Sequence, residues 1–420
     1  MSFDSATLIA WLGMFCFGYP FAMAWYWMTG ALLFRLLRER HEPLPDQPPV
    51  LADYPGVSLL VPCHNEADTA DETFAVLAAV QYPNLEIIAI NDGSKDTTAA
   101  VLDALATRMP NLRVVHLERN QGKSVALNVG ALCASHEILV CIDGDALLDP
   151  HAVTWFVRRF QADPGLGALT GNPRIRNRGS LLGRMQVGEF SSIVGLIKRA
   201  QSVYGRIFTV SGVICAFRKR ALHEAGWWSP TALTDDVEVT WRIQLAGWRA
   251  TFEPKAMCWI LMPETFKGLW RQRLRWAEGG SQSLMNATGP MFKRRAWRLL
   301  PVWLNHWVSV LWAYCIALAF GWWAVWQLSG GRVGEGIALS PLPTSWGTIL
   351  VVTYLAQALV SALLDRRFEG GILRSIFWVV WYPLAFWFLQ VCTAVLAFPR
   401  ALLRPKDAPG TWVSPDRGFR

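Results

Sequence analysis

Four long apolar stretches constrain the fold of this chain more than any other feature. They run from about Leu8 to Phe34, Pro301 to Leu328, Trp346 to Leu364 and Ile372 to Phe398. A helix needs about 20 apolar residues to cross a hydrocarbon core about 30 Å thick, and each stretch is long enough. The sequence is 52% apolar and contains 23 Trp, which exceeds the apolar share of an ordinary soluble protein. We therefore expect a membrane protein.

The charges beside these stretches predict how the chain is oriented. The first stretch has no Lys or Arg ahead of it and no clear cleavage site, so we interpret it as a retained anchor. By the positive-inside rule, the basic residues in Arg35–Arg40 and Asp365–Arg367 place the segments after the first and third apolar stretches in the cytoplasm. Four crossings put the C-terminus outside, whereas Arg400–Lys406 favours the inside. A kinked or re-entrant helix at Pro383 reconciles the two signals, and the sequence leaves this open.

Net charge and cysteine content narrow the kinds of partner. The net charge of +8 suits nucleic acid or anionic lipid, but the basic runs Arg35–Arg40 and Lys293–Arg298 adjoin apolar segments, which favours lipid. We expect no nucleic-acid partner. The eight cysteines have no paired spacing and no neighbouring His cluster, which indicates neither a disulfide framework nor a zinc site.

The soluble part, about Pro55 to Pro263, alternates strand and helix patterns. Four short runs rich in branched residues are each followed by polar residues and a helical stretch: Val57–Pro62, Leu85–Ile90, Leu112–Leu117 and Glu137–Ile142. This pattern predicts a parallel α/β domain. Polar clusters at Cys63–Glu66, Asn91–Ser94 and Asp143–Asp145 follow three of the runs, so we expect them at one sheet edge. The absence of Gly-x-Gly-x-x-Gly and Walker A motifs argues against dinucleotide and P-loop domains.

Two acidic clusters supply candidate catalytic groups. Asp143-Gly144-Asp145 offers hard oxygen ligands that suit Mg²⁺ or Mn²⁺ bridging to a pyrophosphate, although any acidic turn has this pattern. The second cluster is Thr234–Glu238, which also reads as a helix start with Thr234 as cap. Sugar hydroxyls are poor nucleophiles at neutral pH, so sugar transfer needs a carboxylate base of this kind.

The run Glu264–Gly280 contains a Gln-Arg-x-Arg-Trp signature, formed by Gln272, Arg273, Arg275 and Trp276. Guanidinium groups make forked bonds to phosphate oxygens, and an indole offers a flat apolar face for a sugar ring. Alone, the run also reads as a basic helix at anionic lipid headgroups. Together with the acidic clusters it favours a pyrophosphate and a sugar as ligands.

These motifs together resemble the processive family 2 glycosyltransferases, and among them the bacterial branch that makes poly-β-1,6-N-acetylglucosamine for biofilm matrix. The similarity covers nearly the whole chain, through Val61–Glu66, Cys141–Leu148, Thr170–Arg176, Val210–Gly212, Cys258–Glu264 and Trp412–Gly418. Two departures are visible. The common Glu-Asp pair is Asp235-Asp236 here, and one apolar stretch precedes the catalytic domain where relatives often have two.

The resemblance implies a GT-A type fold with a mostly parallel sheet, a uridine diphosphate N-acetylglucosamine (UDP-GlcNAc) donor and inverting transfer to a growing polysaccharide. On the donor side it implies Asn65, Glu66, Asp92 and Lys123 around the uridine and pyrophosphate, Asp143 beside the nucleotide and Asp145 on the metal. It further implies that Gln272, Arg273 and Arg275 cover the diphosphate. Asp236 is then the catalytic base with Asp235 beside it, and Trp276 stacks under the acceptor sugar.

The resemblance also implies a domain plan and partners. The plan has an anchor (1–40), a cytoplasmic transferase domain (50–280), interfacial helices (281–299), transmembrane helices forming a polymer channel (300–400) and a C-terminal tail (401–420). It implies a multi-pass protein of the bacterial inner membrane with a small membrane partner subunit and with cyclic di-GMP activation at the partner interface.

Three alternatives remain from the sequence. Another family 2 membrane synthase, of the chitin, hyaluronan or cellulose type, shares these motifs, since no residue is assigned to the acetamido group by spacing. A transferase that loads a lipid phosphate carrier has less need of Trp276 and differs in product length. A non-catalytic nucleotide-binding gate of a secretion complex gains nothing from paired carboxylates without metal or base chemistry.

Overall fold

An eight-stranded sheet carries the polar motifs in this computed structural model, which describes residues 5–330, 345–379, 386–405 and 407–410. The strand order is β3-β2-β1-β4-β7-β6-β8-β5. The strands are β1 (Val57–Cys63), β2 (Leu85–Asp92), β3 (Leu112–Leu117), β4 (Ile138–Ile142), β5 (Leu147–Leu148), β6 (Leu166–Ile175), β7 (Ile214–Arg218) and β8 (Arg249–Ile260).

Strand direction divides the sheet into two parts. Strands β3, β2, β1 and β4 are parallel, and they are the four runs predicted from the sequence. Strand β7 runs antiparallel to both β4 and β6, β6 is parallel to β8, and β5 is antiparallel to β8. The α/β prediction is therefore confirmed, with a mixed sheet.

Helices cover both faces of the sheet because neighbouring residues of each strand point to opposite sides. Leu59 packs in the core beneath α2 (Ala67–Ala78), α3 (Thr98–Arg108) and α5 (Ala152–Ala162). Leu60, the next residue, packs on the other face with α4 (Lys123–Cys133), α8 (Lys219–Ala225) and α9 (Asp235–Leu245). The polar ends of the strands are thus held between two helical layers.

A second group of helices lies beside the sheet. Helix α6 (Leu181–Phe190), the π-helical segment η2 (Ser191–Ile197) and α7 (Lys198–Tyr204) follow one another without a break. Helix α10 (Phe266–Lys293) is also continuous, and Pro290 lies inside it. The predicted interfacial segment 281–299 is, up to Lys293, the second part of α10, and its place in the membrane interface stays a prediction. Proline removes only its own N–H from the ladder, and the helix ends three residues later.

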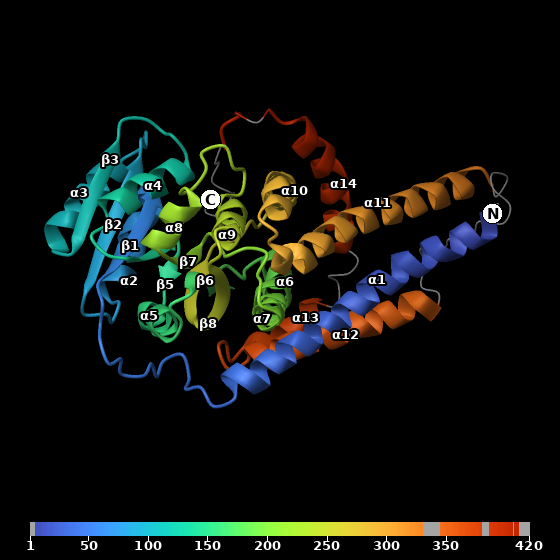
Figure 1. Cartoon of the computed structure of the whole chain (residues 1–420), viewed down its shortest axis with the longest axis horizontal. Coiled ribbons are helices and arrows are strands. Elements are labelled where there is room, and N and C mark those ends of the chain that lie inside the picture. Colours follow the sequence, from blue (N-terminus) through green and yellow to red (C-terminus); the bar gives the residue numbers. More distant parts are fainter. Residues whose placement is uncertain (1–4, 331–344, 380–385, 406, 411–420) are drawn as a thin grey trace.

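Long apolar helices project from the sheet on one side (Figure 1). They are α1 (Ser5–Phe34), continued by η1 (Arg35–Glu39), α11 (Leu300–Leu328), which follows the short η3 (Trp297–Leu299), and α12 (Ser345–Asp365). Within the described residues, Trp297–Leu328 and Gly347–Asp365 are long and apolar enough to cross a membrane. Side chains of α1 and α12 share one buried cluster, so these two helices lie side by side.

The fourth apolar stretch is not one helix over its described part. It contains η4 (Ile372–Ser375), α13 (Ile376–Val379) and α14 (Phe388–Leu403). The kink expected at Pro383 lies outside the described residues, and the number of crossings stays a prediction. All eight cysteines are free, as expected from their spacing.

A buried ion network joins the long helices to the sheet. The carboxylate of Asp365, at the end of α12, accepts bonds from Arg174 of β6 (2.9 Å), Arg199 of α7 (2.8 Å) and the hydroxyl of Ser191 (2.7 Å). Arg199 also donates to Glu39 of η1, at 3.1 Å. Because these charged side chains are buried, each depends on its partners for the hydrogen bonds that water would supply. The network therefore fixes where α1 and α12 meet the sheet.

Candidate active site

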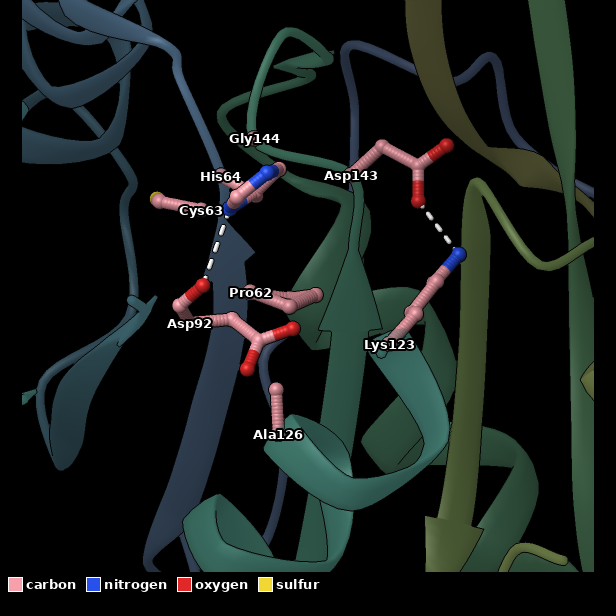
Figure 2. A pocket seen from close by; sticks show the side chains of 8 residues that line it. All are labelled: Pro62, Cys63, His64, Asp92, Lys123, Ala126, Asp143 and Gly144. Atoms are coloured by element: carbon pink, nitrogen blue, oxygen red, sulfur yellow. Dashed lines mark hydrogen bonds and ion pairs between the residues drawn. The ribbon is translucent and has the colours of Figure 1, made fainter. Parts of the chain in front are cut away.

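Polar side chains from the ends of β1, β2 and β4 meet in one pocket, as the sequence predicts. Figure 2 shows its lining, which consists of Pro62, Cys63, His64, Asp92, Lys123, Ala126, Asp143 and Gly144. Three predicted site residues, Asp92, Lys123 and Asp143, are among them. The pocket therefore lies at the carboxyl ends of the parallel strands, where α/β domains bind ligands.

Asp92 organises the start of helix α4. Its Oδ1 accepts the backbone N–H of Gln121 and its Oδ2 that of Gly122, both at 2.8 Å. Gly122 has φ of +91°, a conformation that a residue with a Cβ rarely adopts. Asp92 and Gly122 together place Lys123 at the first position of α4.

Lys123 links the two halves of the site. Its Nζ donates to Asp143 Oδ1 at 2.5 Å and to the carbonyl oxygen of Gly212, on the loop before β7, at 3.0 Å. Burial alone lowers the pKa of Lys123, but Asp143, Asp235 and Asp236 outweigh it and raise the pKa above its ordinary value. Lys123 is therefore a cation surrounded by three carboxylates.

Asn65 and Glu66 hold the loop after β1. Asn65 has a positive φ of 55°, and its backbone N–H donates to Ser94 Oγ at 3.0 Å. Glu66 is buried, and its N–H donates to Thr98 Oγ1 at 2.8 Å. A Cβ on Gly144 would lie 3.3 Å from Glu66 Cγ, so Glu66 packs behind the Asp143–Asp145 turn. Both residues thus border the pocket lining, and their contacts with substrate stay predictions.

The carboxylate ligands at Asp143-Gly144-Asp145 suit a cation that binds together with the phosphates of a substrate. No group of three or more His, Cys, Asp or Glu side chains in the described part of the chain forms a ready metal cage. Mg²⁺ is usually held by one or two carboxylates together with substrate phosphates, so a complete protein cage is not required. Asp143 is bonded to Lys123, and the assignment of Asp145 to the metal stays a prediction.

Asp236 lies in the first turn of α9, opposite Lys123. Its Oδ2 accepts the N–H of Gly212 at 3.2 Å, and its Oδ1 accepts the N–H of Val237 at 2.9 Å. Burial raises the pKa of Asp236 and the neighbouring Asp235 raises it further, against the opposing effect of Lys123. A raised pKa makes the ionised carboxylate a stronger proton acceptor. Thr234 occupies the cap position but makes no side-chain capping bond.

Helix α10 brings its signature motif beside this base. Gly279 packs against Thr234, since a Cβ on Gly279 would lie 2.4 Å from Thr234 Oγ1. Arg275 donates to the carbonyl oxygen of Leu233 at 3.3 Å. Trp276 is 37% exposed, so part of its indole is accessible to solvent. The structure therefore packs α10 against the segment Leu233–Thr234, which leads into the Asp235-Asp236 cluster.

Arg273 and Gln272 are placed differently from what the resemblance implies. Arg273 is buried, its Nη2 donates to the buried carboxylate of Glu189 at 2.7 Å, and its guanidinium lies 4.3 Å from the Trp276 ring centroid. In this structure Arg273 supports Trp276 from inside the protein and does not line the pocket. Gln272 Oε1 is buried without a hydrogen-bond partner. Glu189 was missed from sequence, where its only signal is a single acid between Val187 and Phe190.

The chain returns to the site near its C-terminus. The N–H of Gly410 donates to the carbonyl oxygen of Pro230 at 2.9 Å, and Arg404 lies 3.7 Å from Glu278 of α10. Gly410 O also lies 3.3 Å from where a Cβ on Gly122 would be. Residues 407–410 therefore run between the start of α4 and the loop before Asp235. The predicted motif Trp412–Gly418 lies outside the described residues.

Comparison with known proteins identifies the class. Residues 55–279 match the family described as glycosyltransferase like family 2, so the chain belongs to this family and is a glycosyltransferase. The match contains both acidic clusters and the start of α10, which agrees with the resemblance inferred from the motifs.

Two relatives are more specific. The chain is 36% identical over 401 residues to the poly-β-1,6-N-acetyl-D-glucosamine synthase of Staphylococcus aureus strain MSSA476, covering 95% of this chain and 97% of that protein. It is also 36% identical over 403 residues to the synthase of the same name from Staphylococcus epidermidis strain ATCC 35984, with the same coverage. The predicted branch of the family is thereby confirmed.

A solved structure supports the fold. The mannosyltransferase PcManGT from Pyrobaculum calidifontis, in complex with GDP-mannose and Mn²⁺, aligns with a TM-score of 0.56 at 23% identity, over 87% of this chain and 99% of that one. The predicted GT-A type fold is confirmed. The roles of individual site residues stay predictions.

Proposed function

We propose that this glycosyltransferase builds β-1,6-linked poly-N-acetylglucosamine from UDP-GlcNAc at the bacterial inner membrane and passes the polymer through its membrane helices. One observation carries the proposal: Lys123 bonds both Asp143 and Gly212, and Gly212 bonds Asp236. The donor side and the base thus belong to one site. The names of the two staphylococcal relatives support the choice of sugar and linkage.

The proposed reaction is a single displacement. Asp236 takes the proton of the acceptor hydroxyl, and the hydroxyl oxygen attacks the anomeric carbon from the side opposite the diphosphate. The bond between that carbon and the diphosphate oxygen breaks, and its electron pair leaves with UDP. An α-linked donor gives a β-linked product without a covalent enzyme intermediate, and the proton on Asp236 is then lost to solvent. Lys123, held cationic by its carboxylate neighbours, offsets negative charge near the leaving group.

A divalent cation fits beside this chemistry. Mg²⁺ or Mn²⁺ held by Asp145 and the diphosphate would neutralise charge on the leaving UDP. We expect Asp145→Asn to lower UDP affinity and to raise the metal concentration needed for half-maximal activity, each by roughly tenfold or more, since even the loss of an outer-shell partner of a metal ligand costs about 10- to 100-fold in metal affinity. Titration of activity with MgCl₂ and calorimetric UDP binding measure both. Asp71→Asn, which alters an exposed acid paired with Arg108, is the control. Full parental activity in excess chelator would remove the metal from the mechanism.

Trp276 is proposed as the platform for the acceptor sugar. Trp276→Ala removes an aromatic contact worth about 0.5 to 1.5 kcal/mol beyond buried area, which corresponds to a roughly two- to tenfold loss. We expect elongation to fall by at least this factor while UDP affinity stays unchanged, with partial recovery in Trp276→Phe. Polymer length and UDP release are measured per folded, membrane-inserted molecule, and Trp25→Ala, an exposed Trp of α1, is the control. Unchanged normalised synthesis in Trp276→Ala would contradict the assignment.

The proposed activity is tested on membranes that contain the full chain. They are incubated with separate radiolabelled uridine diphosphate sugars, with and without divalent metal, and the product is identified by linkage-specific hydrolysis. We expect a long polymer from UDP-GlcNAc that a β-1,6-specific hydrolase degrades. A product of one sugar on a lipid would favour the carrier-loading alternative, and binding of the donor without turnover would favour the nucleotide-binding gate.

The proposal places more of the chain in the membrane than the two described helices that are long and apolar enough to cross it. A multi-pass arrangement with the sheet in the cytoplasm places the donor site where UDP-GlcNAc is available. The small membrane partner and activation by cyclic di-GMP stay predictions from the family resemblance.

A further inference from the structure

Lys198 is a buried lysine whose ammonium group is hydrogen-bonded to two hydroxyls. It is the first residue of α7 and is 6% exposed. Its Nζ donates to Ser211 Oγ at 2.7 Å and to Thr170 Oγ1 at 3.0 Å, both neutral hydroxyls. Within the described part of the chain, no carboxylate lies within ion-pair distance of it. Burying an ammonium without a paired anion is costly, which makes a purely structural role for this side chain unfavourable.

The two hydroxyls connect Lys198 to the proposed base. Thr170, in β6, also accepts the N–H of Ser211 at 2.9 Å, so Lys198 and Thr170 hold Ser211 from two sides. The next residue is Gly212, whose N–H donates to Asp236 Oδ2 at 3.2 Å. A Cβ on Gly212 would lie 3.3 Å from the same oxygen, so the turn is in direct contact with the carboxylate. Any shift of Ser211 is therefore transmitted to Asp236.

Electrostatics gives Lys198 a second effect on the same carboxylate. Burial lowers the pKa of Lys198 to about 8, while Asp236 and Cys215 act in the opposite direction. Interaction between two titrating groups is reciprocal, so the charge of Lys198 also favours ionised Asp236. The other charged groups that face Asp236 are Asp235 and Lys123, and they act with opposite signs. Lys198 is thus the second cation near the base.

We propose that Lys198 is a positioning residue for sugar transfer, which holds the Ser211–Gly212 turn against Asp236 and favours the ionised base. The inference rests on the proposed function, because it assigns Lys198 to the same reaction. It makes a prediction that the sugar-transfer activity by itself does not make. The rate of transfer should decline above about pH 8, where Lys198 loses its proton. Loss of that proton removes a buried charge and does not weaken the fold, so such a decline reports on the site and not on unfolding.

The test compares Lys198→Met with the parent in membranes, with kcat, donor KM and their pH dependence expressed per folded molecule. We expect kcat to fall by roughly 10- to 100-fold, which is less than the 10² to 10⁴ expected for complete loss of a general base, because the base is misplaced but present. Donor KM should stay within about threefold, since Lys198 touches no pocket-lining residue. The acidic limb of the kcat profile should move to higher pH, and the decline above pH 8 should disappear. Lys198→Arg keeps the charge and should restore the acidic limb.

Two further variants keep the outcome decisive. Lys255→Met is the matched control, because Lys255 is equally buried but pairs with Glu42 at 2.7 Å outside the site, and its pH profile should match the parent. Ser211→Ala removes one hydroxyl and should shift the acidic limb in the same direction as Lys198→Met. The proposal is overturned if the pH profile of Lys198→Met is the same as that of the parent. If Lys198→Met does not insert into the membrane, a parental pH profile of Ser211→Ala overturns the proposal instead. Absence of polymer from the parent itself contradicts the proposed function instead.

Discussion

Asp236→Asn is expected to abolish polymer synthesis while donor affinity stays within a few-fold of the parent. The amide retains one oxygen, which can still accept the N–H of Gly212 although the bond from Val237 is then lost, and it takes no proton from the acceptor. Loss of a general base lowers the rate by about 10² to 10⁴. The measurement is kcat for polymer formation beside calorimetric UDP binding.

Stability distinguishes this result from misfolding. Because burial and Asp235 raise the pKa of Asp236, its ionised form is less favourable in the folded protein than in the unfolded chain at neutral pH. Asp236→Asn should therefore keep or raise the unfolding midpoint at pH 7. Glu238→Gln, two residues along the same helix and paired with Arg242, is the control that should retain activity. Loss of UDP binding in proportion to loss of synthesis would show that Asp236 belongs to the donor site.

Asp365→Asn is expected to destabilise the folded protein strongly. Arg174 and Arg199 are buried and both donate to this carboxylate, so the substitution removes the anion that they share and leaves each with one other acid, Glu369 at 3.9 Å and Glu39 at 3.1 Å. Breaking a buried ion pair by removing one partner costs about 3 to 5 kcal/mol. The measurement is the thermal unfolding midpoint of protein in lipid nanodiscs, followed by Trp fluorescence.

Its control is Glu224→Gln, which breaks an exposed pair with Arg220 on helix α8 and should leave the midpoint nearly unchanged. Equal midpoints for Asp365→Asn and the parent would mean that the network is not required to hold α12 against the sheet.

The sequence predicts the donor half of the fold well because its signals are local. Each of β1 to β4 is a short run of branched residues, polar clusters follow β1, β2 and β4, and a parallel α/β order then brings these ends together. The direction of β7, in contrast, cannot be predicted from local signals of this kind. Its residues Ile214–Arg218 are as apolar as those of a parallel strand, and only its pairing with β4 and β6 makes it antiparallel. Periodicity reports which face is buried, but not the direction of the neighbour.

The sequence predicts the site residues that belong to short motifs, but it misses those whose partners lie far away along the chain. Asp143 and Lys123 are found from strand ends and family pattern. The bond between Arg273 and Glu189 joins residues 84 positions apart, and whether a helical side chain faces the pocket or the interior depends on that packing. Lys198 was not singled out for the same reason, since its partners Thr170 and Ser211 come from other segments.

The ion network around Asp365 has a consequence for the order in which the protein is completed. Arg174 and Asp365 are 191 positions apart, and Arg199 precedes Asp365 by 166. At roughly 5 to 20 residues per second, the ribosome needs roughly 10 to 40 s to pass from Arg174 to Asp365. During that interval the nascent sheet holds two guanidinium groups that lack their final anion. The sheet is therefore expected to reach its final packing only after α12 emerges, and nascent chains arrested before it should be more sensitive to protease.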